Sequence, residues 1–158
     1  MNLIILYIIA ATTTLTVKSF AFKNNGFVPA KYTCDGTNIN PDLMITMIPA
    51  NTKSLAIIVE DPDAPNGTFS HWVMWDIPVK NNVIKENSKP GMQGRNGMQE
   101  NKYFGPCPTS GLHHYHFKVY ALDTMLSSLA HNTDKKGLLN AMEGHIISSG
   151  DLVGLYQR

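Results

Sequence analysis

The chain has 158 residues, of which 43% are hydrophobic and 16% are charged, so it suits one domain with a sizeable core and is not a disordered chain. Its 13 basic and 12 acidic residues give a formal charge of +1, and no basic run exceeds the pair Lys135 and Lys136. Because nucleic-acid binding needs clustered positive charge, no nucleic-acid partner is expected, and any bound anion must be held locally.

The first 13 residues contain an apolar run from Leu3 to Ala11, which has the length of a signal-peptide core. The run is too short to cross a bilayer, so no integral membrane span is expected. No Lys or Arg precedes Leu3, and a hydrophobic first strand is the alternative. Residues 1–13 are thus a candidate signal peptide ahead of a single domain at 14–158. This predicts an exported protein, periplasmic or secreted, with a cytoplasmic one as the alternative.

Three segments read as strands, because they are rich in β-branched and aromatic residues and are separated by prolines: 54–60, 71–77 and 114–122. No helical crossover separates them, which predicts a mainly β fold with an antiparallel sheet core. Residues 80–110 read as a long structured loop. A helix is expected where Leu138, Leu139, Met142 and Ile146 recur at helical spacing, with Asn132 and Thr133 as capping candidates; a strand returns at 151–156.

Each apolar strand face ends in a polar residue. By alternation, Asp61 shares a face with Val59, His71 with Trp75, and His113 with Phe117. A hairpin from Asp61 to His71 would bring these two together, and His113 would join them at one rim of the core. The intervening His114, His116 and Lys118 point to solvent by the same rule. Two prolines on each side stiffen the loops next to this rim, which predicts a small pocket with a few aimed polar groups.

Several motifs occur in order: "FVPAKYTCDG", "DPDAP", "HWVMWDIP", "GRNG", "YFGPCPTSGLHHY", "VYALD" and "AMEGHIISSGDLVGLY". Together they resemble the phosphatidylethanolamine-binding protein family, also called Raf kinase inhibitor-like, in its bacterial and archaeal branch. The resemblance covers about residues 15–158. It implies a sheet of mostly antiparallel strands with one or two peripheral helices and a shallow anion pocket at one end.

Carried over by position, the resemblance implies a ligand pocket lined by Asp61, Pro65, His71, Gly105, Pro106, His113 and Tyr115. The chain departs from the branch at His114, where an arginine is usual, and at Gly97, where an aspartate is common. From the residues alone, Cys34 and Cys107 are either a disulfide or two buried thiols. The resemblance places both beside pocket loops, so we expect them close together and bridged in an exported protein.

The function expected from this resemblance is non-enzymatic binding of a small anion such as phosphate, acetate or phosphoethanolamine, without a cofactor or a metal. Neutral His71 and His113 are expected to donate one hydrogen bond each to the anion, with Tyr115 adding its hydroxyl, and Asp61 to orient a histidine. If either histidine gains a proton as the anion enters, that hydrogen bond becomes charge-assisted, and affinity is expected to increase as pH falls toward about 6. The alternatives are inhibition of a protease or kinase through surface loops, with a protein partner, and a hydrolase that uses Cys107 and His113. The protein is expected to be a monomer or a homodimer.

Overall fold

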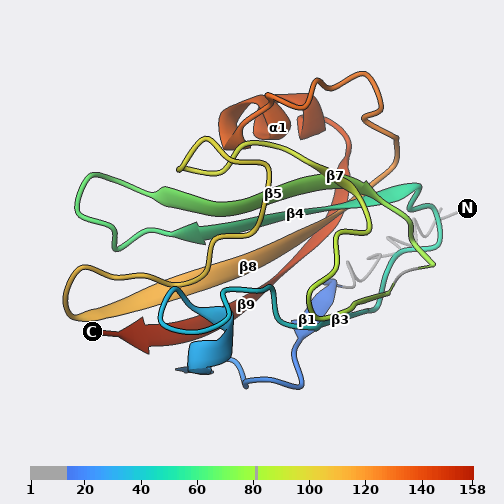
Figure 1. Ribbon diagram of the computed structural model, residues 1–158. Helices are drawn as coiled ribbons and strands as arrows, with labels where there is room; N and C mark the ends of the chain where they lie inside the picture. Colours follow the sequence, from blue (N-terminus) through green and yellow to red (C-terminus); the bar gives the residue numbers. More distant parts are fainter. Residues whose placement is uncertain (1–13, 81) are drawn as a thin grey trace, which may run out of the picture.

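Two β-sheets and one α-helix make up the fold over residues 14–80 and 82–158, the part of the chain that the computed structural model describes (Figure 1). The mainly β architecture predicted from the sequence is confirmed. Residues 1–13 lie outside the described part, so the signal peptide stays a prediction.

The larger sheet has six strands, and all neighbours are antiparallel except the parallel pair β2 and β9. Its order is β2 (Gly26–Phe27), β9 (Ile146–Gln157), β8 (Leu112–Leu122), β4 (Ser54–Asp61), β5 (Phe69–Ile77) and β7 (Met92–Gln93). The three predicted strands correspond to β4, β5 and β8. They form the centre of the sheet, with β9 beside β8 (Figure 1).

Strand β4 is buried along its whole length, because both faces of the sheet are covered. One face packs against a three-stranded sheet of β1 (Thr16–Lys18), β3 (Leu43–Thr46) and β6 (Val83–Ile84). Leu55, Ile57 and Val59 belong to this core, whereas Ala56 and Ile58 pack on the other side beneath the helix. A strand covered on both faces reads as a continuous apolar run, as "SLAIIVE" does.

The helix α1 (Lys135–Met142) starts and ends differently from the prediction. Its cap is Asp134, whose side chain accepts a hydrogen bond from the Gly137 backbone, and not Asn132 or Thr133. Ile146, which the spacing placed on the helix, is the first residue of β9. The reason is Gly144, whose φ of 78° is in the left-handed region and ends the helical pattern.

The segment between residues 80 and 110 has little regular structure, in agreement with the sequence. Its described residues, 80 and 82–110, contribute the two-residue strands β6 and β7, one to each sheet. Its last part runs past the ends of β4, β5 and β8, where it joins the loop around the 3-10 helix Ala30–Tyr32. This end of the large sheet, at the left of Figure 1, carries the candidate site.

Candidate functional site

Three strand ends meet at this end of the large sheet. β4 ends at Asp61, a hairpin leads into β5, and β8 runs antiparallel to β4, with His116 opposite Glu60. The rings of His71 and Tyr115 contact edge to face at 5.2 Å, and His113 Nδ1 lies 2.7 Å from Asp61 Oδ2. The polar residues predicted at the strand ends therefore do come together.

A β-bulge at the start of β5 decides where His71 points. The register of β4 and β5 shifts between Val59 and Glu60, which leaves His71 without a paired residue in β4. The alternation rule placed His71 on the face of Trp75, and this was wrong. Trp75 packs beneath α1, whereas His71 contacts Tyr115, which belongs to the core on the opposite side. A bulge inserts one residue and so reverses the alternation beyond it, which the sequence pattern does not reveal.

Asp61 and His113 form a buried pair, with side chains only 5% and 9% exposed. The other carboxylate oxygen of Asp61 accepts a hydrogen bond from the Asp63 backbone N–H at 2.8 Å. Because the carboxylate accepts, the Nδ1–H of His113 donates, and the ring is fixed with its other nitrogen, Nε2, turned away from Asp61. Asp61 thus orients a histidine, as expected from the sequence.

His71 is fixed in a similar way by a backbone carbonyl. Its Nδ1 lies 2.6 Å from the oxygen of Phe104, so Nδ1 carries the proton, and the Phe104 ring stacks on the imidazole at 5.7 Å between centroids. Burial lowers the pKa of His71, and this outweighs the opposing effects of the Phe104 carbonyl and the Asp61 charge. The imidazole is therefore neutral at pH 7, with a lone pair on Nε2.

Tyr115 lies fully buried between the two histidine rings. Its hydroxyl lies close to the backbone of Cys107, which by itself would lower the pKa of the hydroxyl. Burial, and secondarily the charge of Asp61, raises the pKa of Tyr115, so the hydroxyl keeps its proton over the physiological range. Tyr115 therefore supports the two histidine rings from within the core as a neutral side chain.

A cavity of about 400 Å³ opens at this point, and we call it the strand-end cavity. Four of the predicted residues line it: Asp61, Pro65, His71 and His113. The other three, Gly105, Pro106 and Tyr115, are not among the lining residues. The sequence reasoning missed most of the apolar wall, which comprises Ala64, Phe69, Met98, Phe104 and Pro108. Phe104 lies within the quoted motif "YFGPCPTSGLHHY", and Phe69 lies two residues before His71 of "HWVMWDIP", so these two aromatic residues were the available signal.

Gly105 and Pro106 hold the loop that forms one wall of the cavity. The Gly105 backbone N–H donates to Asn38 Oδ1 at 2.7 Å, and the Pro106 carbonyl accepts from the Cys34 backbone at 3.1 Å. Cys34 and Cys107 form a disulfide across the same two loops, which confirms their predicted proximity. The bridged sulfur of Cys107 has no thiolate to offer as a nucleophile.

The histidines on the opposite face of β8 have separate partners at the surface. His114 Nδ1 lies 2.7 Å from Asp63 Oδ2, and His116 Nδ1 lies 2.6 Å from Asp151 Oδ2. Both histidines are outside the strand-end cavity. Within residues 14–80 and 82–158, no group of three or more His, Cys, Asp or Glu side chains is arranged to hold a metal ion.

Comparison with known proteins places this geometry in a family. A sequence model of the phosphatidylethanolamine-binding protein family matches residues 18–157. A UPF0098 protein from Pyrococcus horikoshii is 52% identical over 150 residues, which cover 89% of this chain and 75% of the relative.

Solved structures agree. A phosphatidylethanolamine-binding protein homolog from Chlamydia trachomatis superposes with a TM-score of 0.88 at 36% identity, covering 92% of this chain and 98% of the other. YbcL from E. coli, described as a member of the mammalian PEBP family, gives 0.85 at 26% identity, covering 92% and 99%. In the described part of the chain, no helix is long and apolar enough to cross a membrane.

Proposed function

The chain belongs to the phosphatidylethanolamine-binding protein family, in its bacterial and archaeal branch, and from this premise we propose that it binds a small anion in the strand-end cavity without catalysing a reaction. Phosphate, acetate and phosphoethanolamine are the ligands to test. The observation that carries the proposal is the pair of buried histidines, His71 and His113, which line one cavity with both Nδ1 atoms held by fixed acceptors.

The fixed Nδ1 atoms change the expected way of binding. A neutral histidine has one N–H, and in both residues that N–H already donates within the protein. Of the two modes expected from the sequence, these contacts favour donation by a protonated ring over donation by a neutral one. Only a protonated ring has a second N–H, on Nε2, to offer to the cavity.

The positive charge for an anion must come from these rings, because neither Lys nor Arg is among the residues that line the cavity. An anion next to the Nε2 of His71 favours the imidazolium and so raises its pKa above the depressed value of the empty site. Binding then takes up a proton, and affinity increases as pH falls from 7 to about 6. The charge-assisted hydrogen bond is also roughly twice as strong as a neutral one.

The test is calorimetric titration of inorganic phosphate and acetate between pH 5.5 and 8, in two buffers of different ionisation enthalpy so that proton uptake is counted. We expect tighter binding at lower pH, with a net uptake of protons. His71→Gln and His113→Gln should weaken binding at least about tenfold, the value of one lost charge-assisted hydrogen bond.

His114→Gln is the matched control, because His114 also pairs with an aspartate but lies outside the cavity. Thermal melts of each variant report whether it folds. Binding that is independent of pH, or equal losses in all three variants, would show that the anion is bound elsewhere. Inhibition of a protease or kinase remains a separate prediction, tested by assay against such enzymes.

A further inference from the structure

The hairpin between β4 and β5 brings an exposed asparagine to the strand-end cavity. Gly67 donates its backbone N–H to the Ala64 carbonyl at 3.2 Å, which closes a β-turn with Pro65 and Asn66 in its centre. The side chain of Asn66 makes no hydrogen bond with any described residue. Asn66 and Gly67 both line the cavity, so a chemical change at Asn66 would take place beside the proposed anion.

An asparagine that precedes a glycine can convert itself to an acid. The backbone nitrogen of the glycine loses its proton and attacks the side-chain Cγ of the asparagine. A C–N bond forms, and the amide nitrogen leaves as ammonia after taking up a proton, which gives a cyclic succinimide. Water then opens the ring to aspartate or isoaspartate. Glycine favours this reaction because it has no side chain to obstruct the attack and its backbone adopts many conformations.

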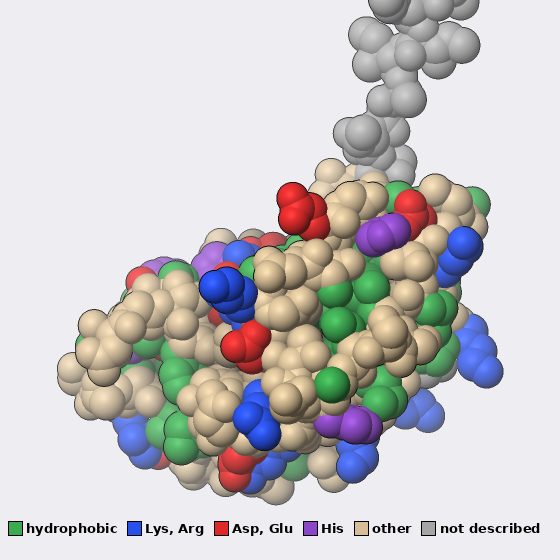
Figure 2. Space-filling model, turned by 90° about the horizontal axis from the view of Figure 1, so that it is seen from above, with side chains coloured by type: hydrophobic (Ala, Val, Ile, Leu, Met, Phe, Trp, Pro, Cys, Tyr) green, Lys and Arg blue, Asp and Glu red, His purple; other side chains and the backbone are tan. Residues whose placement is uncertain are grey.

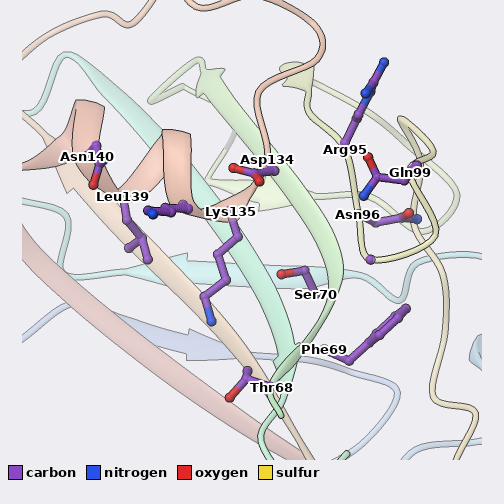
Figure 3. A pocket seen from close by; sticks show the side chains of 12 residues that line it. Thr68, Phe69, Ser70, Arg95, Asn96, Gln99, Asp134, Lys135, Leu139 and Asn140 are labelled. Carbon is purple, nitrogen blue, oxygen red and sulfur yellow. The ribbon is translucent and has the colours of Figure 1, made fainter. Parts of the chain in front are cut away.

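The chain contains three Asn-Gly sequences, of which the one at Asn96 is the most protected. Asn96 is 2% exposed, its Nδ2 donates to the Lys102 carbonyl at 3.0 Å, and its Oδ1 accepts from two backbone N–H groups of its own loop. Figure 3 shows this side chain within that loop. The attacking nitrogen, that of Gly97, donates to the Ser70 carbonyl at 2.7 Å. Both reacting groups are therefore fixed.

The sequence at Asn25 is exposed, but its backbone is held on both sides. The N–H of Asn25 donates to the Val153 carbonyl at 2.7 Å, and that of Gly26 donates to the Lys23 carbonyl at 2.8 Å. A Cβ on Gly26 would lie 2.9 Å from the Lys23 oxygen, whereas a Cβ on Gly67 would have nothing within 4 Å. Of the three sites, the turn at Asn66 thus has the most room to reach the geometry of attack.

We propose that Asn66 is a site of spontaneous deamidation and that the carboxylate formed there weakens anion binding in the strand-end cavity. The inference rests on the proposed anion binding and adds a regulation of the same site, an irreversible loss of affinity as the protein ages. The acidic residue already in the lining, Asp61, is paired with His113. A carboxylate at position 66 has no such partner and repels an anion through a short distance.

Incubation of the purified protein for days at pH 8 tests the chemistry. Peptide mapping by mass spectrometry should show aspartate and isoaspartate at Asn66, with Asn25 converted more slowly and Asn96 unchanged in the same sample. Conversion should be slower at pH 6, because the attacking nitrogen must lose its proton. Asn66→Gln should abolish the change at this position, since cyclisation of glutamine requires a larger ring that forms more slowly.

Calorimetric titration with inorganic phosphate at pH 6 tests the effect on binding. The aged wild type and fresh Asn66→Asp should both bind phosphate about threefold or more weakly than the fresh wild type, the effect of one nearby, partly solvated charge. Aged Asn66→Gln should keep its affinity. Asn25→Asp is the matched control, because it places the same charge at an exposed Asn-Gly sequence outside the cavity. Thermal melts report whether each variant folds.

The outcomes separate this inference from the proposed function. Conversion of Asn25 or Asn96 as fast as Asn66, or an Asn66 that stays intact while urea-unfolded protein is converted, overturns the assignment of the site. Aged protein and Asn66→Asp that bind phosphate as tightly as fresh wild type overturn the regulation and leave anion binding intact. Fresh wild type that binds no phosphate overturns the proposed function and the regulation together, and the peptide maps still decide which asparagine reacts.

Discussion

His71 and His113 differ from the surface histidines of the chain in their burial and in lining a cavity. His114, His116 and His145 each face an aspartate at the surface, where water solvates the rest of the ring. His71 and His113 are 3% and 7% exposed, and both line the strand-end cavity. Burial lowers the pKa of His71 in the empty site, and an anion beside its ring would supply the compensating charge for the protonated form.

The depressed pKa of His71 predicts how stability depends on pH in the empty protein. The unfolded chain takes up a proton on this residue near pH 6.5, whereas the folded protein resists it because the ring is buried. The contribution of His71 to stability is therefore complete above about pH 6.5 and is lost as the pH falls below that value. Urea unfolding between pH 5 and 7.5 should show this decline, and His71→Gln should make it shallower.

Added phosphate gives the opposite trend in the same experiment. A bound anion makes protonation of the folded state favourable, so the stabilisation by phosphate should grow as pH falls over the same range. His114→Gln, which removes an exposed histidine, should leave both trends unchanged. If the unfolding free energy depends on pH in the same way in the wild type and in His71→Gln, another group is responsible for the dependence.

At the scale of elements, the long strands could be predicted from the sequence, whereas the bulge in β5 and the apolar wall of the cavity could not. β4, β5 and β8 follow from β-branched and aromatic runs between prolines, and their polar ends located Asp61, His71 and His113. The bulge at His71 was missed because one inserted residue leaves no mark in a hydrophobic pattern. The apolar wall was missed because Met98 comes from the loop between β7 and β8, where no periodicity exists.

The disulfide and the hydrogen bonds of the same loops predict that removing the bridge lowers the unfolding free energy but does not prevent folding. Cys34 and Cys107 are 73 residues apart, and closing such a loop is worth about 4 kcal/mol in the chain-entropy model. The Cys34→Ser, Cys107→Ser double variant should therefore lose up to about 4 kcal/mol of unfolding free energy. It should still fold, because Gly105 and Pro106 keep their hydrogen bonds to the opposite loop.

Urea unfolding of the double variant, compared with the wild type with and without reductant, measures this effect. Thiol counting on denatured, unreduced protein is the companion measurement, and we expect no free thiol. Two free thiols in exported protein, or a double variant as stable as the oxidised wild type, would contradict the structural role of the bridge.

At the scale of the whole molecule, the charges are dispersed. Figure 2 shows Lys, Arg, Asp and Glu side chains interspersed on the face seen from above, where they form no continuous basic area. Such a surface provides little long-range attraction for an anion. The anion binding that we propose must therefore depend on the residues inside the strand-end cavity.

The N-terminus provides the last prediction, which concerns where the protein is located. The described residues are packed into the domain from their start: Leu15 is 2% exposed, its backbone N–H donates to Ser148 Oγ, and β1 follows at Thr16. Removing residues 1–13 should consequently leave the unfolding free energy unchanged to within about 0.5 kcal/mol.

We propose that residues 1–13 are a cleaved signal peptide and that the protein is exported. The disulfide supports this proposal, because oxidising compartments preserve such bonds. N-terminal sequencing of protein recovered from the periplasm or medium should begin near residue 14. Protein that keeps Met1 in the cytosol, with Leu3 to Ala11 protected from protease, would show instead that the apolar run is part of the folded domain.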